Sequence, residues 1–305
     1  MPEFDYISWL RSRTPTDPRV LVGPGDDTAV LAPTARPMLV TTDLLTDGVD
    51  FRLAEVEPRR VGRKAMAVNL SDIAAMAGEP RSAVVGLVLP RTAGQRLAEE
   101  LYLGLRDAAD AFGVSIVGGD TNSWDGSLVI GVTVIGEATA RGAVLRRGAR
   151  VGDWLLVTGS LGGSLLGHHF DFTPRVREAL ALHAVADLHA MIDISDGLAA
   201  DVHHILEESR CGAVLYADAI PIAPAAWTMS QTSGRTPLEH ALGDGEDFEL
   251  VFAVPPEDGE RLQRDSPFPG MDLTKIGECV ESGFWLENEG ARRPLVPTGW
   301  VHRLG

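Results

Sequence analysis

Acidic side chains recur in this chain where apolar, strand-like segments meet glycine, serine or threonine. In MIDISDGLAAD (residues 191–201), Asp193 and Asp196 stand on either side of Ser195, just as an apolar run ends. Related segments are GPGDDTAV with Asp27, TTDLLTDGVDF with Thr41, Thr42 and Asp43, VGGDTNS with Gly119 and Asp120, and GDGEDFEL with Glu246 and Asp247. Open α/β sheets collect ligands at the carboxyl ends of their strands, and carboxylates beside hydroxyls are the oxygen donors that Mg²⁺ prefers. The segments together predict a shared site for metal ions and phosphate groups.

Asp72 strengthens this prediction because its surroundings are apolar. It lies in PRRVGRKAMAVNLSDIAAMAG (58–78), a helix-like segment that is apolar on nearly all sides, with Asn69 one turn earlier. Such a helix is expected to be buried, and a buried carboxylate needs a metal ion or a charged partner. For Asp196 taken alone a simpler interpretation is open, since an aspartate before a helix is commonly its N-cap.

Several catalytic motifs are absent from the sequence, and their absence argues against the enzyme classes that use them. There is no GxxxxGK[ST] phosphate loop, no protein-kinase HRD or DFG segment and no GxSxG nucleophile elbow. The segment DISDGLAADVHH is not an EF-hand either, because its twelfth position is His204 instead of glutamate.

Alternating strand-like and helix-like segments must position these side chains. Strands are predicted at 37–45, 81–90, 114–119 and 127–138, with helices at 58–78 and 93–113. After the polar stretch TARGAVLRRGARVGD (139–153), the pattern repeats with strands in DWLLVTG, MIDIS, CGAVLYADAIP, FELVFAVP and TKIGECV and helices near 175–189 and in GLAADVHHILEES. This order predicts an α/β protein of two domains, residues 1–145 and 146–305.

The composition of the chain limits the binding partners and the cellular compartment that we expect. The 305-residue chain carries a formal net charge of −16 and only two cysteines, Cys211 and Cys279, outside any CxxC spacing. An acidic surface repels nucleic-acid backbones and anionic lipids, so neither nucleic acid nor membrane is expected as a partner. We find neither a signal-peptide pattern nor an apolar run long enough to span a membrane, and we expect a reduced, cytoplasmic location.

Across its whole length the chain resembles the thiamine-monophosphate kinase family, within the aminoimidazole-ribonucleotide-synthetase (PurM-like) superfamily. The resemblance is carried in family order by GDDTAVL, TTDLLTDGVDF, GRKAMAVNLSDIAAMAGEP, GGDT, LRRGARVGDWLLVTGSLG, DISDGLAADVHHI and GEDFELVF. It implies a two-domain PurM-like α/β (α+β) fold, whose N-terminal domain binds ATP and Mg²⁺ and pairs with its twin in a homodimer. It also implies that ATP and Mg²⁺ lie between the two domains and that thiamine monophosphate is phosphorylated to thiamine diphosphate.

The resemblance also assigns roles to individual residues. The metal ligands it implies are Asp27, Thr41, Thr42, Asp43, Asp72, Asp120, Asp193 and Asp196, and the six aspartates among them are the catalytic set. The implied nucleotide contacts are Tyr102, Gly119, Asp120, Arg146 and Ser195, and the implied substrate contacts are Asp50, Glu246 and Trp300. This chain departs from the family at Asp50, where histidine is usual, and in a shorter region at 160–175, which keeps His169, Pro174 and Arg175.

The expected reaction is a direct in-line phosphoryl transfer without a phosphoenzyme. The acceptor phosphate is already ionised near neutral pH, so the transfer requires no general base, and metal ions with Arg146 would offset the repulsion between the two anions. Two alternatives stay open: another ATP-dependent enzyme of the superfamily with a different acceptor, or a non-catalytic scaffold of the same fold. A selenophosphate synthetase is disfavoured because the N-terminal segment has no cysteine.

Overall fold

Two structural units account for the chain. The computed structural model describes residues 9–24, 28–92 and 94–300. Unit 1 comprises Met1–Ile73 and Gly78–Gly142, and unit 2 comprises Ala74–Ala77 and Ala143–Gly305.

Unit 1 is built on a four-stranded sheet. Its strands lie in the order β3 (Met38–Thr46), β6 (Val129–Glu137), β4 (Glu79–Pro90) and β5 (Ser115–Trp124). β6 runs antiparallel to both β3 and β4, whereas β4 and β5 are parallel. A separate two-stranded ribbon pairs β1 (Val20–Val22) with β2 (Val30–Leu31). The four strands predicted from the sequence in this half are all present. β5 runs five residues beyond its predicted end, so Asp120 lies inside that strand and not at its end, and Asp43 likewise lies inside β3.

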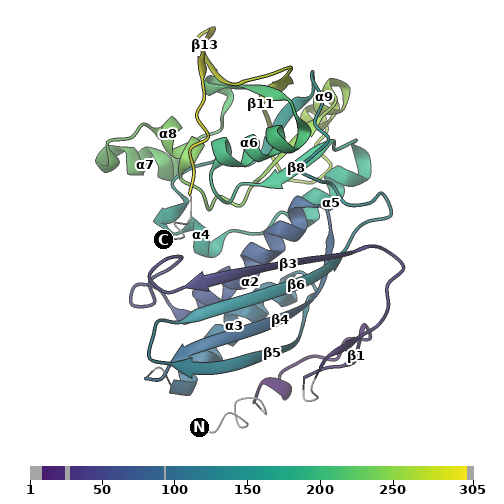
Figure 1. The fold of residues 1–305 in the computed structure, drawn as a ribbon, viewed down its shortest axis with the longest axis vertical. Coiled ribbons are helices and arrows are strands. Elements are labelled where there is room, and N and C mark those ends of the chain that lie inside the picture. Colours follow the sequence, from purple (N-terminus) through teal and green to yellow (C-terminus); the bar gives the residue numbers. More distant parts are fainter. Residues whose placement is uncertain (1–8, 25–27, 93, 301–305) are drawn as a thin grey trace. The chain divides into compact units, whose positions relative to one another are not determined.

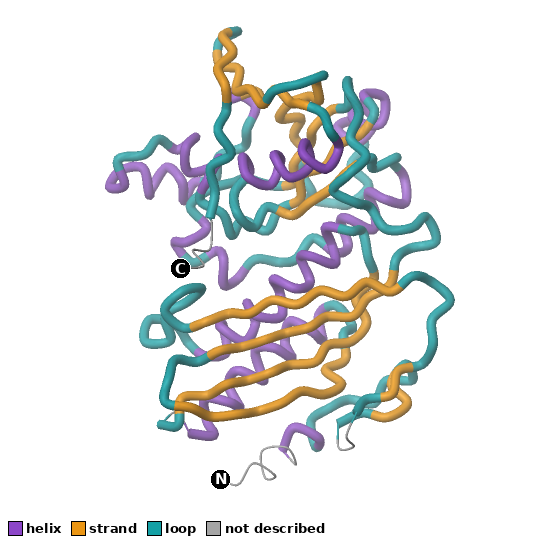
Figure 2. Tube along the Cα trace, in the orientation of Figure 1, coloured by secondary structure: helices purple, strands orange, loops and turns teal. Residues whose placement is uncertain are grey.

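Two long helices, α2 (Pro58–Ala75) and α3 (Gly94–Ala111), cover one face of this sheet (Figures 1 and 2). Glycines allow the helix backbones to touch, because a Cβ on Gly62 would overlap the Leu101 carbonyl and one on Gly104 would overlap that of Arg59. The prediction that the apolar helix in residues 58–78 is buried is therefore confirmed, because α2 is enclosed by α3 and by the sheet.

The opposite face of the sheet is covered by no described helix of unit 1 (Figure 1). Successive side chains of a strand point to opposite faces, and along β3 the outward ones are Met38, Val40, Thr42 and Leu44. Three of them are large, exposed apolar side chains, and Leu44 is 71% exposed. We call this surface the open sheet face.

Unit 2 contains a seven-stranded mixed sheet in the order β13-β12-β9-β11-β7-β10-β8. Only β12 and β9 pair in parallel. The strands are β7 (Trp154–Thr158), β8 (Ala190–Asp193), β9 (Gly212–Tyr216), β10 (Leu250–Val254), β11 (Leu273–Val280), β12 (Phe284–Asn288) and β13 (Ala291–Pro294). The strands expected from the sequence are present, whereas β12 and β13 were not expected.

Helices of unit 2 pack around this sheet. They are α4 (His168–Asp171), α5 (Val176–Val185), α6 (Leu198–Ser209), α7 (Pro224–Ser233), α8 (Pro237–Gly243) and α9 (Pro256–Arg264), with 3₁₀ turns η1 (Ser164–Leu166) and η2 (Ala217–Ala219). A buried apolar core joins β7, β8, β9 and β10 to the inner side of α6. None of the helices in the described part of the chain is long and apolar enough to cross a membrane.

Candidate functional site

The first acidic cluster lies where β3 meets α2. Thr41 and Asp43 occupy the inner, helix-facing side of β3, and the Thr41 hydroxyl donates a hydrogen bond to the Asp72 carboxylate on α2. Asn69, one turn before Asp72, accepts the backbone N–H of Asp43 at 3.1 Å and donates to the Ala65 carbonyl at 3.0 Å. The buried amide thus fixes the strand against the helix and holds Asp43 near Asp72.

Electrostatics within this cluster favour the binding of a cation. Burial, followed by the charges of Asp72 and Asp50, raises the pKa of Asp43 to about 7. A shift in this direction means that the carboxylates repel one another and are poorly solvated. A divalent cation would relieve both effects, and the donors present are carboxylate and hydroxyl oxygens, which suit Mg²⁺.

The loop after β3 brings Asp50 close to this cluster. The Asp50 carboxylate accepts the Thr46 N–H at 2.7 Å, and its backbone carbonyl accepts a hydrogen bond from Lys64 Nζ at 2.9 Å. Lys64 is on α2 and is only 1% exposed, so a buried ammonium group anchors the loop. The sequence reasoning missed Lys64, although a lysine inside the apolar run GRKAMAVNL was a usable signal.

Other predicted residues of unit 1 do not join this cluster. Thr42 points to the open sheet face, where its hydroxyl accepts from Thr133 at 2.9 Å and donates to the Val132 carbonyl at 3.1 Å. Gly119 and Asp120 are on β5, and strand register places Gly119 in the same row as Asp43 but three strand spacings away, about 14 Å. Tyr102 is buried on α3 with its ring edge against Trp9. Asp27 lies outside the described residues.

The second acidic cluster lies at the end of β8, in unit 2. Asp193 is the last, buried residue of that strand, and Asp201 on α6 accepts the backbone N–H groups of Asp196 (3.1 Å) and Gly197 (3.0 Å). Gly197, and not Asp196, holds the N-cap position of α6. Burial, then the charges of Asp193 and Asp196, raises the pKa of Asp201 to about 8, against the lowering effect of the two N–H bonds.

Asp201 and His204 are members of this cluster that the sequence reasoning did not assign. Donor atoms of Asp196, Asp201 and His204 all lie within 4.8 Å of one another, and they form a group that could hold a metal ion. Asp201 and His204 are three residues apart on α6, so they share one helix face. That spacing, directly after IDISDG, is the signal that could have identified them.

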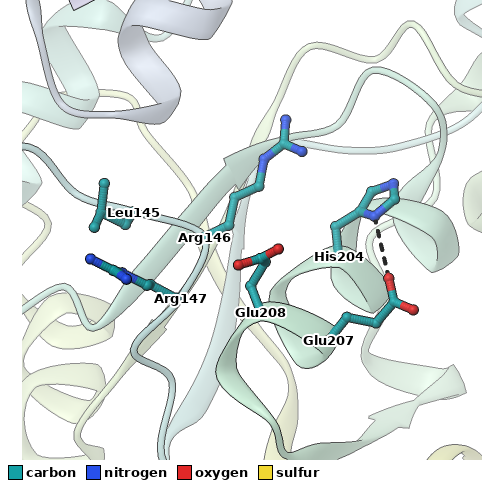
Figure 3. A pocket seen from close by; sticks show the side chains of 6 residues that line it. All are labelled: Leu145, Arg146, Arg147, His204, Glu207 and Glu208. Atoms are coloured by element: carbon teal, nitrogen blue, oxygen red, sulfur yellow. Dashed lines mark ion pairs between the residues drawn. The ribbon is translucent and has the colours of Figure 1, made fainter.

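Arg146 lines a pocket beside this second cluster. The pocket has a volume of about 420 Å³, with Leu145, Arg146 and Arg147 on one side and the α6 residues His204, Glu207 and Glu208 on the other (Figure 3). The Ser209 hydroxyl accepts the N–H groups of Gly148 (3.0 Å) and Ala149 (3.1 Å) and donates to the Arg146 carbonyl (3.3 Å). The segment with the arginines is therefore fixed to the end of α6, and His204 belongs to both the pocket and the acidic cluster.

Backbone hydrogen bonds attach two of the three predicted substrate contacts, Glu246 and Trp300, to the same segment. The N–H of Glu246 donates to the Ser195 carbonyl at 2.7 Å, and the N–H of Trp300 donates to the Asp196 carbonyl at 2.9 Å. The Trp300 side chain is 55% exposed, so part of its surface is accessible to a ligand. Unit 2 thus brings together Asp193, Ser195, Asp196, Glu246 and Trp300.

Comparisons with known proteins agree with this arrangement of the chain. The N-terminal domain model of AIR synthase related proteins matches residues 25–138, and the C-terminal domain model matches residues 150–284. The thiamine-monophosphate kinase of Rhodopirellula baltica is 44% identical over 310 residues, which cover 98% of this chain and 97% of that protein.

Two solved structures are similar to this chain over nearly its whole length. The thiamine-monophosphate kinase of Stenotrophomonas maltophilia has a TM-score of 0.81 at 32% identity, covering 95% of this chain and 97% of that one. AaThiL complexed with AMPPCP and TMP has a TM-score of 0.77 at 31% identity, covering 99% of this chain and 97% of that one. The PurM-like α/β fold is therefore confirmed, and the chain belongs to the thiamine-monophosphate kinase family of AIR synthase related proteins.

Proposed function

We propose that this protein transfers the γ-phosphoryl group of ATP to thiamine monophosphate and forms thiamine diphosphate. The observation that carries the proposal is the near full-length similarity to kinases of this name, one of which was solved with AMPPCP, an ATP analogue, and TMP. Two carboxylate clusters that could hold metal ions, and Arg146 in a pocket beside one of them, also support the proposal. A scaffold without turnover would have no reason to keep acidic clusters in which Asp193 and Asp201 are buried and Asp43, Asp72 and Asp196 are half-buried.

The donor sets fit Mg²⁺. In unit 1 the residues that would hold it are Thr41, Asp43 and Asp72, and in unit 2 they are Asp193 and Asp196, with Asp201 beside them. Asp27, Thr42 and Asp120 remain predicted ligands on the resemblance alone. When bound, Mg²⁺ would neutralise charge on the phosphates of both substrates.

The protein's own residues contribute binding and orientation. Arg146 supplies a fixed positive charge for the nucleotide phosphates, with Ser195, Gly119 and Tyr102 as further predicted nucleotide contacts. No side chain needs to remove a proton, because the acceptor phosphate is already ionised, so transfer is direct and in line. We assign residues 1–145 to ATP and Mg²⁺ binding and dimerisation, and 146–305 to the second domain. The two free cysteines suit a reducing cytoplasm.

A product assay tests this function. Purified protein is incubated with ATP, Mg²⁺ and thiamine monophosphate, beside parallel reactions with other phosphomonoesters, and products are separated by chromatography. Thiamine diphosphate and ADP should form in equal amounts, and γ-labelled ATP without acceptor should leave no label on the protein. Efficient turnover of a different acceptor would support another enzyme of the superfamily, and absence of any turnover would support the scaffold.

The open sheet face is the proposed homodimer interface. Met38, Val40 and Leu44 present exposed apolar side chains along an edge strand, with Thr42 between the last two, and such a surface is unfavourable to leave in water. Leu44→Arg should convert the protein to a monomer in sedimentation velocity, because each dimer would bury two guanidinium groups. Val185→Arg, at an exposed apolar residue of unit 2, is the control and should sediment like the parent. A dimeric Leu44→Arg variant, or a monomeric parent, would refute this interface.

Trp300 is the proposed aromatic contact of the acceptor. If its exposed ring stacks on a ring of thiamine monophosphate, Trp300→Ala should raise the KM for that substrate by up to about tenfold, because a lost aromatic contact costs roughly 0.5–1.5 kcal/mol. The KM for ATP should change little. Steady-state kinetics with each substrate varied in turn measures both constants. Equal losses for the two substrates with a lower Tm would show instead that Trp300 covers the core.

A further inference from the structure

His169 is a buried histidine that none of the assignments above uses. It lies on the short helix α4 and is 7% exposed. Its Nδ1 atom lies 2.8 Å from Oε2 of Glu246, the predicted substrate contact. The imidazole also packs against Phe170, with ring centroids 4.0 Å apart. A side chain from the 160–175 region thus reaches the carboxylate that the resemblance places at the acceptor.

The backbone of Glu246 is held in a conformation that its residue type rarely adopts. Its φ is 55°, in the left-handed region, and Phe248 two residues later has a φ of 51°. Hydrogen bonds fix this segment from both sides. The Glu246 N–H donates to the Ser195 carbonyl, the Glu246 carbonyl accepts from the Ser164 hydroxyl at 2.6 Å, and the Phe248 N–H donates to the Ile194 carbonyl at 2.8 Å.

Strained residues persist where the surroundings determine them fully, and they cluster at binding sites. The backbone conformation of Glu246 is therefore fixed, and only its side-chain torsion angles can still vary. A hydrogen bond from His169 Nδ1–H to Oε2 restricts those torsions, and an ionised carboxylate has about four acceptor positions in all, so one such bond does not exhaust its capacity for a ligand.

We propose that His169 is a positioning residue that orients the Glu246 carboxylate toward a cationic or amino-bearing ring of the acceptor. The inference rests on the proposed function, in which the acceptor is thiamine monophosphate. It concerns acceptor binding alone and assigns His169 no part in phosphoryl transfer. Losing a hydrogen bond to a charged group changes an equilibrium by roughly ten- to a hundredfold, and this sets the expected scale.

The test separates a positioning role from a structural one. His169→Ala should raise the KM for thiamine monophosphate at least tenfold and leave kcat and the KM for ATP within about twofold. His169→Asn, whose amide N–H can take the place of Nδ1–H, should recover most of the loss. His168→Ala, at the exposed neighbour on the same helix, is the matched control and should behave as the parent.

A double-variant cycle shows whether His169 acts through Glu246. In a Glu246→Gln background, adding His169→Ala should raise the KM for thiamine monophosphate by less than about twofold, because the oriented carboxylate is already gone. Additive effects, an unchanged KM in His169→Ala, or equal losses for both substrates would overturn the inference. A parent protein that makes no thiamine diphosphate would refute the proposed function and the inference together, whereas an active parent with an unaffected His169→Ala variant refutes the inference alone.

Discussion

Asp196→Asn is expected to lower kcat for thiamine diphosphate formation by at least roughly 10²–10³-fold, the cost of removing one preorganised electrostatic contact from an enzyme site. Asn has nearly the size of Asp but lacks the charge that would hold a metal ion against phosphate. The N-cap of α6 is Gly197, so a capping role for Asp196 does not offer a competing reason for the aspartate. Asp193→Asn should have an effect of the same order. Initial rates over a Mg²⁺ titration measure both.

Melting curves give a second readout of the same variant. Asp201 has a pKa of about 8 in the folded protein, above its ordinary 3.8, so the stability it contributes is present at acid pH and is lost as pH rises toward 8. Asp196→Asn removes one of the charges that raise that pKa. Without ligands, the variant should therefore melt at or above the parent's temperature at pH 8. With Mg²⁺ and ATP present, it should lose much of the ligand-induced rise in Tm.

The control for this experiment is Asp218→Asn, at an exposed aspartate on η2 of the same unit. It removes an equal charge away from the cluster and should retain the parent's kcat, Mg²⁺ dependence and Tm. An Asp196→Asn enzyme with normal activity and normal Mg²⁺ dependence would refute the metal assignment at that position.

The fold could be predicted from the sequence wherever local pattern and burial agree. The spacing of apolar residues predicts the helix at 58–78 and the strands of the first half. Helices α2 and α3 end shortly before Gly78 and Gly113, the glycines that predicted their ends. The hairpin of β12 and β13 was missed because β13 (ARRP) is short and fully exposed, so it lacks the alternation that marks a strand. Helix α7 was missed because only Ala226 of its residues is buried, and α8 was missed because its seven residues are too few to establish a helical period.

The candidate site was predictable in its residue types but not in its geometry. The pattern of aspartates beside apolar strands identified Asp43, Asp193 and Asp196, although Asp43 lies inside β3 and not at its end. Strand alternation already separates Thr42 from Thr41 and Asp43, but spacing along the chain cannot show that β5 is three spacings from β3. Asp201 was overlooked because it joins the cluster by accepting the backbone N–H groups of Asp196 and Gly197, which precede it in the chain. The spacing of acidic residues in the sequence does not predict such hydrogen bonds.

Arg175→Met is expected to lower the free energy of unfolding by about 3 kcal/mol, the lower end of the usual cost of removing one partner from a buried ion pair, because Glu249 is buried while the Arg175 side chain is 26% exposed. The Arg175 guanidinium donates to both oxygens of Glu249, at 2.8 and 2.6 Å, and to Glu178 at 3.2 Å. Glu249 is buried, and it also accepts from the Thr158 hydroxyl at 2.6 Å. Methionine would fill the space but leave two carboxylates without their cation. Urea unfolding followed by circular dichroism measures the loss.

The pH dependence of that loss identifies its cause. Burial raises the pKa of Glu249 even though Arg175 lowers it, so removing Arg175 should raise that pKa further. A carboxyl group with a raised pKa contributes stability that is lost as pH rises, and the variant should therefore be penalised more at pH 8 than at pH 5. Arg175→Met combined with Glu249→Gln should recover much of the stability, whereas Arg177→Met, at an exposed arginine of α5, should change it by less than about 0.5 kcal/mol. A loss that is equal at both pH values and persists in the double variant would show that Arg175 stabilises unit 2 by packing, and not by compensating the buried charge of Glu249.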